Sequence, residues 1–361
     1  MSDARDLMAR TAELIDIPSV SHDEAAITDH IAALFDELDG FTVDRVGMNV
    51  VARTNLGKAQ RLVLAGHTDT VPVNDNATAR VDGDTLYGLG ASDMKSGLAV
   101  FLEMAQAVGR GEIDPTCDLT FVFYECEEIA REHNGLLKLF ASRPDLTACD
   151  AAILGEPTDA WIEAGCQGAL SVELTFVGAR AHSARPWTGV NAIHRAAVAI
   201  DRVREWPGRQ PVIDDCEYRE AMQVVLVEGG VARNVVPDRC VVTINHRFAP
   251  DHSLDDARAA VRAVVGDAFD EATGDTWNEI DVSVAAPPSL GHPLLAALVE
   301  RSGHPPRAKL GWTDVAFFAE QGIPAANFGP GDPLLAHTQG EYVTRGQLDA
   351  AWQTIVGVVT A

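Results

Sequence analysis

The order of apolar segments constrains the fold of this chain more than any other feature. Apolar runs that predict strands, among them "RLVLAG", "DLTFVFYE" and "CDAAILG", alternate with segments that predict helices, such as "SGLAVFLEMAQAVG". This alternation indicates an α/β fold with a largely parallel sheet covered on both faces. Near residue 168 the order changes to strand, helix, two strands, helix and strand, which is typical of a ferredoxin-like β-α-β-β-α-β domain.

The chain has 361 residues, which is long for one compact core and favours two domains. We expect residues 1–168 and 286–361 to form one discontinuous domain, a mixed sheet flanked by helices. Residues 169–285 then form a second domain inserted into the first. The strand-helix alternation resumes after the insertion, which supports a single discontinuous α/β domain.

Composition excludes several classes of partner. Asp and Glu number 53 against 28 Lys and Arg, so the formal net charge is −25. Such a surface repels nucleic acid and anionic membranes, and no apolar run is long enough to span a bilayer. The first residues lack the basic segment and apolar run of an export signal, and six cysteines show no paired spacing. We therefore expect a cytoplasmic protein with reduced thiols.

Acidic and histidine side chains follow several of the predicted strands. Open α/β sheets bind ligands outside the carboxyl ends of their strands, so side chains at these positions are candidates for one site. Two histidines and three carboxylates suit two divalent cations bridged by one carboxylate, and zinc is the first candidate. These five candidate ligands, which we expect at or soon after strand ends of one sheet, are His67, Asp93, Glu128, Glu156 and His337.

Each candidate also has a simpler explanation when it is considered alone. His67 and Asp69 are two residues apart and could be an ordinary hydrogen-bonded loop pair, or a cation ligand and the residue that orients it. Asp93 could cap the helix that follows it. Glu127 and Glu128 are adjacent, so one carboxylate could bind a cation while the other acts as a base. Spacing does not decide which glutamate has which role.

The sequence resembles a known family in the segments that carry these candidates. The stretches "GHTDTVP", "GLGASDMKSG", "CEEI", "GEPT" and "GPGDPLLAH" are similar to the successive metal-site motifs of the zinc-dependent aminoacylases and carboxypeptidases, and the resemblance covers nearly the whole chain. It implies a di-zinc hydrolase of an acylated amino acid, with cobalt or another divalent metal as a substitute. Acetylornithine deacetylation and dipeptide cleavage are alternative activities within the family. A non-catalytic binding relative is the alternative of another class.

The resemblance also implies how the candidate ligands are shared between the metals. His67 and Glu156 would hold one zinc ion, and Glu128 and His337 would hold the other. Asp93 would bridge the two ions. Chemistry alone is consistent with this division, but only the family motifs assign it.

The remaining roles come from the same resemblance. Asp69 would orient the first histidine, and Glu127 would be the general base. The inserted domain would be a lid that also forms a homodimer, in which His182 reaches the partner subunit's site and stabilises an oxyanion. Two further lid positions, Arg247 and Asn234, match residues that hold substrate carboxylate or amide groups in the family, and Thr313, beyond the lid, matches a position that contacts the substrate.

Two places depart from the family pattern. Many members have Asp directly before the glutamate pair and Gly soon after it, where this chain has Cys126 and Ile129. Cys166 and Gln167 stand where some members carry arginines, which removes one partner for a substrate carboxylate. A chain this acidic needs local positive charge to attract such a substrate, and the metals, Arg247 and either Arg185 or Arg233 are the expected sources, with the forked donors of Arg247 suited to a carboxylate.

Overall fold

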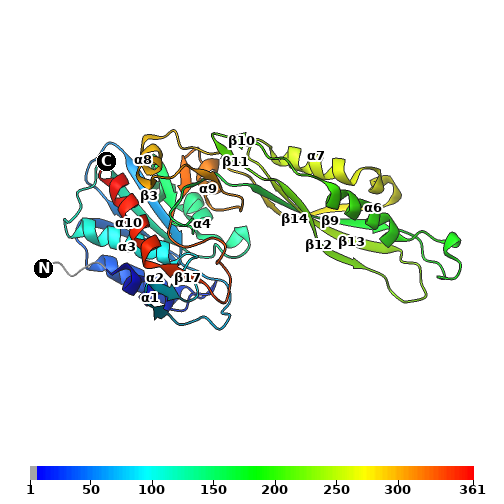
Figure 1. Ribbon diagram of the computed structural model, residues 1–361, viewed down its shortest axis with the longest axis horizontal. Helices are drawn as coiled ribbons and strands as arrows, with labels where there is room; N and C mark the ends of the chain where they lie inside the picture. Colours follow the sequence, from blue (N-terminus) through cyan, green and yellow to red (C-terminus); the bar gives the residue numbers. More distant parts are fainter. Residues whose placement is uncertain (1–5) are drawn as a thin grey trace. The chain divides into compact units, whose positions relative to one another are not determined.

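The computed structural model describes residues 6–361 and divides them into two compact units (Figure 1). The first unit contains the described residues up to Ala164, together with Pro288–Arg307 and Phe317–Ala361. The second contains Gly165–Pro287 and the short segment Ala308–Ala316. The segment 308–316 therefore groups with the inserted unit, although it lies well beyond it in the sequence.

The first unit is built on a mixed sheet, as the sequence predicts. Within the described residues its strands lie in the order β1-β2-β6-β3-β7-β16-β8-β15. The central strands β6, β3, β7 and β16 are parallel, whereas β1, β2 and β8 pair antiparallel, so the parallel part is restricted to the centre. The strands are β1 (Phe41–Val46), β2 (Asn49–Thr54), β3 (Arg61–His67), β6 (Asp118–Tyr124), β7 (Ala151–Leu154), β8 (Glu163–Ala164), β15 (Arg307–Ala308) and β16 (Ala325–Asn327).

Helices contribute apolar faces to a core shared with this sheet. Alternate residues of a strand point to one face, and Leu62 and Leu64 of β3 are buried in this core. Helix α3 is buried along nearly its whole length, as expected of a helix with few polar positions. The helices outside the insertion are α1 (Leu7–Ile15), α2 (Ala25–Asp36), α3 (Lys95–Gly109), α4 (Gly135–Ser142), α5 (Pro144–Thr147), α8 (Pro293–Ser302), α9 (Val315–Glu320) and α10 (Arg345–Val359).

A small antiparallel sheet joins two distant parts of the first unit. It consists of β4 (Arg80–Asp82), β5 (Thr85–Tyr87) and β17 (Tyr342–Thr344), in the order β17-β5-β4. Tyr342 pairs with Tyr87, so the segment that follows the late histidine motif lies against the loop that carries Asp93. This sheet is not apparent from the sequence, because its strands have only three residues each.

The second unit has the β-α-β-β-α-β order that the sequence predicts. Its antiparallel sheet has the strand order β12-β13-β9-β14, and α6 and α7 contribute to its apolar core. The elements are β9 (Gly168–Val177), α6 (Ala192–Glu205), β12 (Ala221–Gly229), β13 (Arg239–Phe248), α7 (Leu254–Val265) and β14 (Thr276–Ser283), with a hairpin of β10 (Val212–Ile213) and β11 (Cys216–Glu217). Among residues 6–361, no helix has the length and apolar character needed to cross a bilayer.

Candidate metal centre

The carboxyl ends of three parallel strands meet at one edge of the main sheet. His67 ends β3 and pairs with Tyr124, which ends β6. On the other side of β3, Ala65 pairs with Leu154, which ends β7. Since the strands are parallel and in register, the residues that follow each strand emerge together. Glu156, two residues beyond β7, is buried at this edge.

Asp93 reaches this edge by a different route, and its expected position after a strand of the main sheet is wrong. It lies in the loop between β5 and α3, and it does not cap α3, because the N-cap residue is Met94. Asp93 lies near the other candidates because α3, which follows it, packs closely against the end of β7. A Cβ atom on Gly97 would lie 2.2 Å from the carbonyl oxygen of Gly155, so glycine is required for the helix to approach the end of β7.

His337 comes from the long loop between β16 and β17. Its loop is held close to the end of β7, because a Cβ atom on Gly329 would lie 2.4 Å from the carbonyl oxygen of Gly155. His337 therefore follows its strand by ten residues rather than directly, and close backbone packing carries it to the same edge as the other candidates.

The two carboxylate oxygens of Asp93 face two different histidines. Oδ1 lies 3.2 Å from Nε2 of His67, and Oδ2 lies 3.6 Å from Nε2 of His337. The same His337 nitrogen lies 3.0 Å from Oε2 of Glu128. The potential ligand atoms of His67, Asp93 and Glu128 all lie within 4.8 Å of one another. Imidazole nitrogens and carboxylate oxygens in this arrangement fit divalent cations on either side of one shared carboxylate.

Asp69 connects the histidine to the turn that carries the two glutamates. Its buried carboxylate accepts hydrogen bonds from the Ser21 hydroxyl at 2.7 Å and from the backbone N–H groups of Glu127 and Glu128 at 3.0 and 3.1 Å. Nδ1 of His67 lies 3.0 Å from the Asp69 carbonyl oxygen and 3.4 Å from its Oδ1. An Nδ1–H donor is favoured there, which leaves Nε2 of His67 as the ligand atom.

Charges within the cluster shift the protonation of its members. Burial acts to lower the pKa of His67, but hydrogen bonds with Asp69 and Asp93 outweigh it and raise the pKa well above the usual value. Hydrogen bonds with Asp93 and Glu128 raise the pKa of His337 to about 10. Burial raises the pKa of Asp93, but both histidines oppose it and the net shift is downward. Burial also raises the pKa of Glu128, and in this case the upward shift remains.

Cation binding at pH 7 is therefore expected to release about one proton from each of His67 and His337, because a metal ligand must offer a neutral imidazole. Without a cation the pKa of His67 is raised well above its usual value and that of His337 is about 10, so apparent affinity should rise with pH and level off only above about pH 10, where His337 becomes neutral by itself. Calorimetry of zinc binding in two buffers of different ionisation enthalpy measures the released protons. His337→Ala should release about one proton fewer, and His182→Ala should match wild type. No proton release from wild type would contradict this electrostatic arrangement.

Glu341 is a functional candidate that the sequence does not reveal. Its buried carboxylate accepts hydrogen bonds from the backbone N–H groups of Gly90, Ser92 and Asp93 at 3.0, 2.8 and 2.9 Å. Burial raises the pKa of Glu341 to about 7, and the three N–H donors act against that shift. The contacts fix the loop from which Asp93 projects. From the sequence "HTQGEYV" alone, Glu341 would be predicted to be solvated. It is buried because β17 pairs with β5.

The other sequence candidates lie in the second unit. His182 is exposed in the loop after β9, and Asn234 is exposed in the loop between β12 and β13. Arg247 lies on β13, where its Nε donates to Oδ1 of Asn245 at 3.1 Å. Thr313 is buried in the 308–316 segment. The cluster of cation-ligand candidates is thus formed within the first unit alone.

Residues 63–361 match Peptidase family M20/M25/M40, and the chain belongs to this family. It is 51% identical over 342 residues to a protein of Mycobacterium tuberculosis named putative succinyl-diaminopimelate desuccinylase, with 94% of each chain covered. It is 44% identical to succinyl-diaminopimelate desuccinylase of Corynebacterium glutamicum, with 93% of this chain and 91% of that protein covered.

Solved structures share the fold at lower identity. Aminopeptidase PepT of Bacillus cereus superposes with a TM-score of 0.79 at 21% identity, covering 98% of this chain and 97% of that chain. The YXEP protein of Bacillus subtilis, described as a dinuclear metal binding peptidase, superposes with a TM-score of 0.73 at 17% identity, covering 98% and 96%. These similarities concern the fold, whereas the two relatives above bear on the activity.

Proposed function

We propose that this protein hydrolyses N-succinyl-L,L-2,6-diaminopimelate to succinate and L,L-diaminopimelate, a step in lysine and meso-diaminopimelate biosynthesis. The observation that carries the chemistry is the placement of the two Asp93 oxygens opposite two histidines, with Glu127 in the adjoining turn. Identity of 44–51% to two relatives that bear this activity in their names supports the choice of acyl group.

Two zinc ions are the proposed cofactors, and cobalt or another divalent cation would substitute. His67 and Glu156 would hold one ion, Glu128 and His337 the other, and Asp93 would be shared. Bound divalent cations polarise an amide carbonyl and lower the pKa of water. The distances between Asp93 and the two histidines support the shared position of Asp93 in this division.

Glu127 is the proposed general base. Its backbone N–H is held by Asp69, and its side chain is only partly buried, so water can reach the carboxylate. Glu127 would take a proton from the attacking water and deliver it to the departing amine, so that the amide C–N bond breaks and no net proton is gained. Asp69 would position both the base and the histidine ligand. Its carboxylate accepts the backbone N–H of Glu127, and its carbonyl oxygen lies beside Nδ1 of His67.

The second unit would act as a lid that anchors the substrate and forms a homodimer. Arg247 is the proposed carboxylate partner, because among residues 6–361 its guanidinium donates to Asn245 through Nε, and a guanidinium offers further N–H donors. Asn234 and Thr313 would assist it. Cys166 and Gln167 are buried in this unit, where Cys166 Sγ donates to the Thr313 carbonyl oxygen at 3.7 Å. Packing inside the unit therefore accounts for Cys166.

The His182 tautomer suits an oxyanion donor. Its Nδ1 accepts a hydrogen bond from the Ala184 backbone N–H at 3.0 Å. A neutral imidazole that accepts at Nδ1 carries its proton at Nε2, so Nε2 is a donor. The side chain is exposed on a loop, which supports a role in completing the site of a second subunit.

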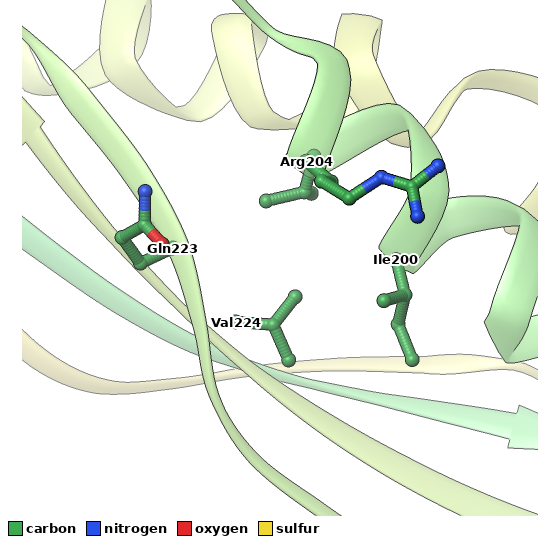
Figure 2. Close-up of a pocket in the computed structure, with 5 residues that line it drawn as sticks. Ile200, Arg204, Gln223 and Val224 are labelled. Carbon is green, nitrogen blue, oxygen red and sulfur yellow. The ribbon is translucent and has the colours of Figure 1, made fainter.

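The edge of the second unit's sheet supports the homodimer. Strand β12 is one of the two outer strands of this sheet, with β14 the other, and it exposes Val225, Leu226 and Val227 in succession. Beside this edge, side chains of α6 and β12 line a cavity of about 270 Å³ (Figure 2). The cavity is lined by Ile200, Val203, Arg204, Gln223 and Val224. A second copy pairing along this edge would cover the three exposed apolar side chains and the cavity, and would satisfy the open backbone groups.

Leu226→Lys is expected to convert a dimer of twice 38.6 kDa into a monomer of 38.6 kDa, because Leu226 is 64% exposed on the edge strand. Sedimentation velocity measures the mass. Val81→Lys places the same charge on an exposed valine of β4 and should remain dimeric. Turnover should fall with the mass if His182 serves the partner's site, and a fully active monomer would contradict that role.

The substrate proposal is tested by comparing kcat/KM of purified, zinc-loaded protein on N-succinyl-L,L-diaminopimelate, N-acetylornithine and simple dipeptides. We expect the succinylated compound to be preferred by at least about a hundredfold, since a site that pairs a substrate carboxylate rejects analogues lacking it. Hydrolysis confined to dipeptides or to acetylornithine would overturn the proposed substrate. The six free cysteines, all within the described residues, support the proposed cytoplasmic location.

A further inference from the structure

The residue directly before the proposed base has an unusual backbone conformation. Strand β6 ends at Tyr124, and two residues later Cys126 has a φ of +59°. Residues other than glycine seldom adopt this left-handed region, because the Cβ atom crowds the backbone. The conformation reverses the chain so that Glu127 and Glu128 follow at once. Surrounding contacts must hold such a residue in place.

Glu24 makes those contacts. Its Oε1 accepts a hydrogen bond from the Cys126 backbone N–H at 3.2 Å and another from the Cys126 thiol at 3.2 Å. Glu24 and Cys126 are each 1% exposed. Glu24 lies directly before α2, and its carbonyl oxygen accepts the Thr28 N–H at 3.0 Å, so the helix fixes its position. The carboxylate is thus anchored on a regular element and reaches into the turn.

Two buried carboxylates therefore share the backbone of one turn. The N–H group of Cys126 donates to Glu24, and those of Glu127 and Glu128 donate to Asp69. Three successive N–H groups are satisfied by side chains rather than by a sheet or helix. We propose that Glu24, acting through Cys126, is a positioning residue that fixes the carboxylate of Glu127 for proton transfer. This inference rests on the proposed role of Glu127 as the base.

The pairing also explains the departure at Cys126 from the family pattern. The backbone of residue 126 is left-handed, and its side chain must be small and must donate a hydrogen bond to a buried carboxylate. The cysteine side chain is small, and its thiol is a donor. An aspartate would place a second negative charge against Glu24. A cation between Glu24, Glu125 and Cys126 is disfavoured, since Glu125 is already paired with Lys138 at 3.0 Å and the thiol with Glu24.

The test compares Glu24→Ala with Glu24→Gln. Removing the acceptor should lower kcat by about ten- to a hundredfold, as expected for a misplaced catalytic group, while KM and the bound cations per chain stay near wild type. Glu24→Gln keeps an oxygen acceptor and should recover most of kcat. Glu103→Ala is the matched control, because Glu103 is another buried glutamate, pairs with Arg10, and should affect stability rather than kcat.

Cys126 provides a second and milder probe. Cys126→Ala removes the thiol donor but keeps the N–H contact, so kcat should fall less than in Glu24→Ala, and Cys126→Ser should restore it. The effects of Glu24→Ala and Cys126→Ala should not add in the double variant, since Glu24→Ala already removes the thiol contact that Cys126→Ala removes. Unchanged kcat in Glu24→Ala and Cys126→Ala would overturn the proposal, as would a loss in Glu24→Ala that Gln does not recover and that parallels loss of cations.

The test of Glu24 can fail or succeed independently of the test of the proposed substrate. Rates are compared between variant and wild type on whichever amide the wild type hydrolyses fastest. The identity of that amide decides the proposed substrate, and the ratio of the two rates decides the role of Glu24.

Discussion

Glu127→Gln is expected to lower kcat by about 10²- to 10⁴-fold while the protein keeps its cations, the range that positioned general bases contribute. Glutamine has the same shape but cannot accept the proton from water. The backbone N–H of residue 127 still donates to Asp69, so the turn should stay in place. Succinate release measures kcat, and plasma mass spectrometry measures bound metal per chain.

Glu125→Gln is the control for this variant. Glu125 belongs to the same turn, but its carboxylate is paired with Lys138 at 3.0 Å. Its replacement should change kcat by no more than about threefold, because its carboxylate is paired with a lysine and, among the described residues, with none of the candidate cation ligands. If Glu127→Gln kept a rate similar to that of Glu125→Gln, another group would have to move the proton.

Glu128→Ala is expected to lose about one of two cations and, with it, nearly all turnover. The substitution removes the carboxylate that faces His337 at 3.0 Å. The contact between His67 and Asp93 does not involve residue 128, so the ligands of the first cation remain. Metal content and kcat should therefore both fall in Glu128→Ala, whereas in Glu127→Gln kcat should fall and metal content should stay the same. Equal metal loss in both variants would contradict the different roles of these adjacent glutamates.

The sequence predicts the centre of the fold well because the central strands are mostly apolar. Every residue of β6 is buried, and such a run can be recognised from composition. Strand β1 was not predicted, because its residues are partly or fully exposed and only its pairing with β2 defines it. The β-α-β-β-α-β unit was predicted because its strands and helices are long and periodic.

The residues of the candidate site also differ in whether the sequence predicts their position. His67, Glu128 and Glu156 could be predicted because they follow buried strands in parallel register. Asp93 was placed wrongly, because its position depends on how closely α3 approaches Gly155, which no local pattern encodes. Glu24 and Glu341 could not be recognised at all.

These two carboxylates are invisible in the sequence for a physical reason. Each lies far along the chain from the backbone N–H groups that it accepts, as between Glu341 and Ser92 or between Glu24 and Cys126. An acidic residue in a polar stretch is normally solvated, so only the tertiary structure shows that these are buried. Supporting contacts of this kind orient ligands and bases without matching a motif.

The most direct measurement is the rate of succinate and L,L-diaminopimelate release from N-succinyl-L,L-2,6-diaminopimelate as zinc is added back to metal-free protein. We expect no release without cation, a rise that is complete at about two zinc ions per chain, and no comparable release from zinc-loaded Glu127→Gln. Release that persists without cation or equally in Glu127→Gln, or no release from fully loaded wild type, would contradict a two-cation site with Glu127 as its base.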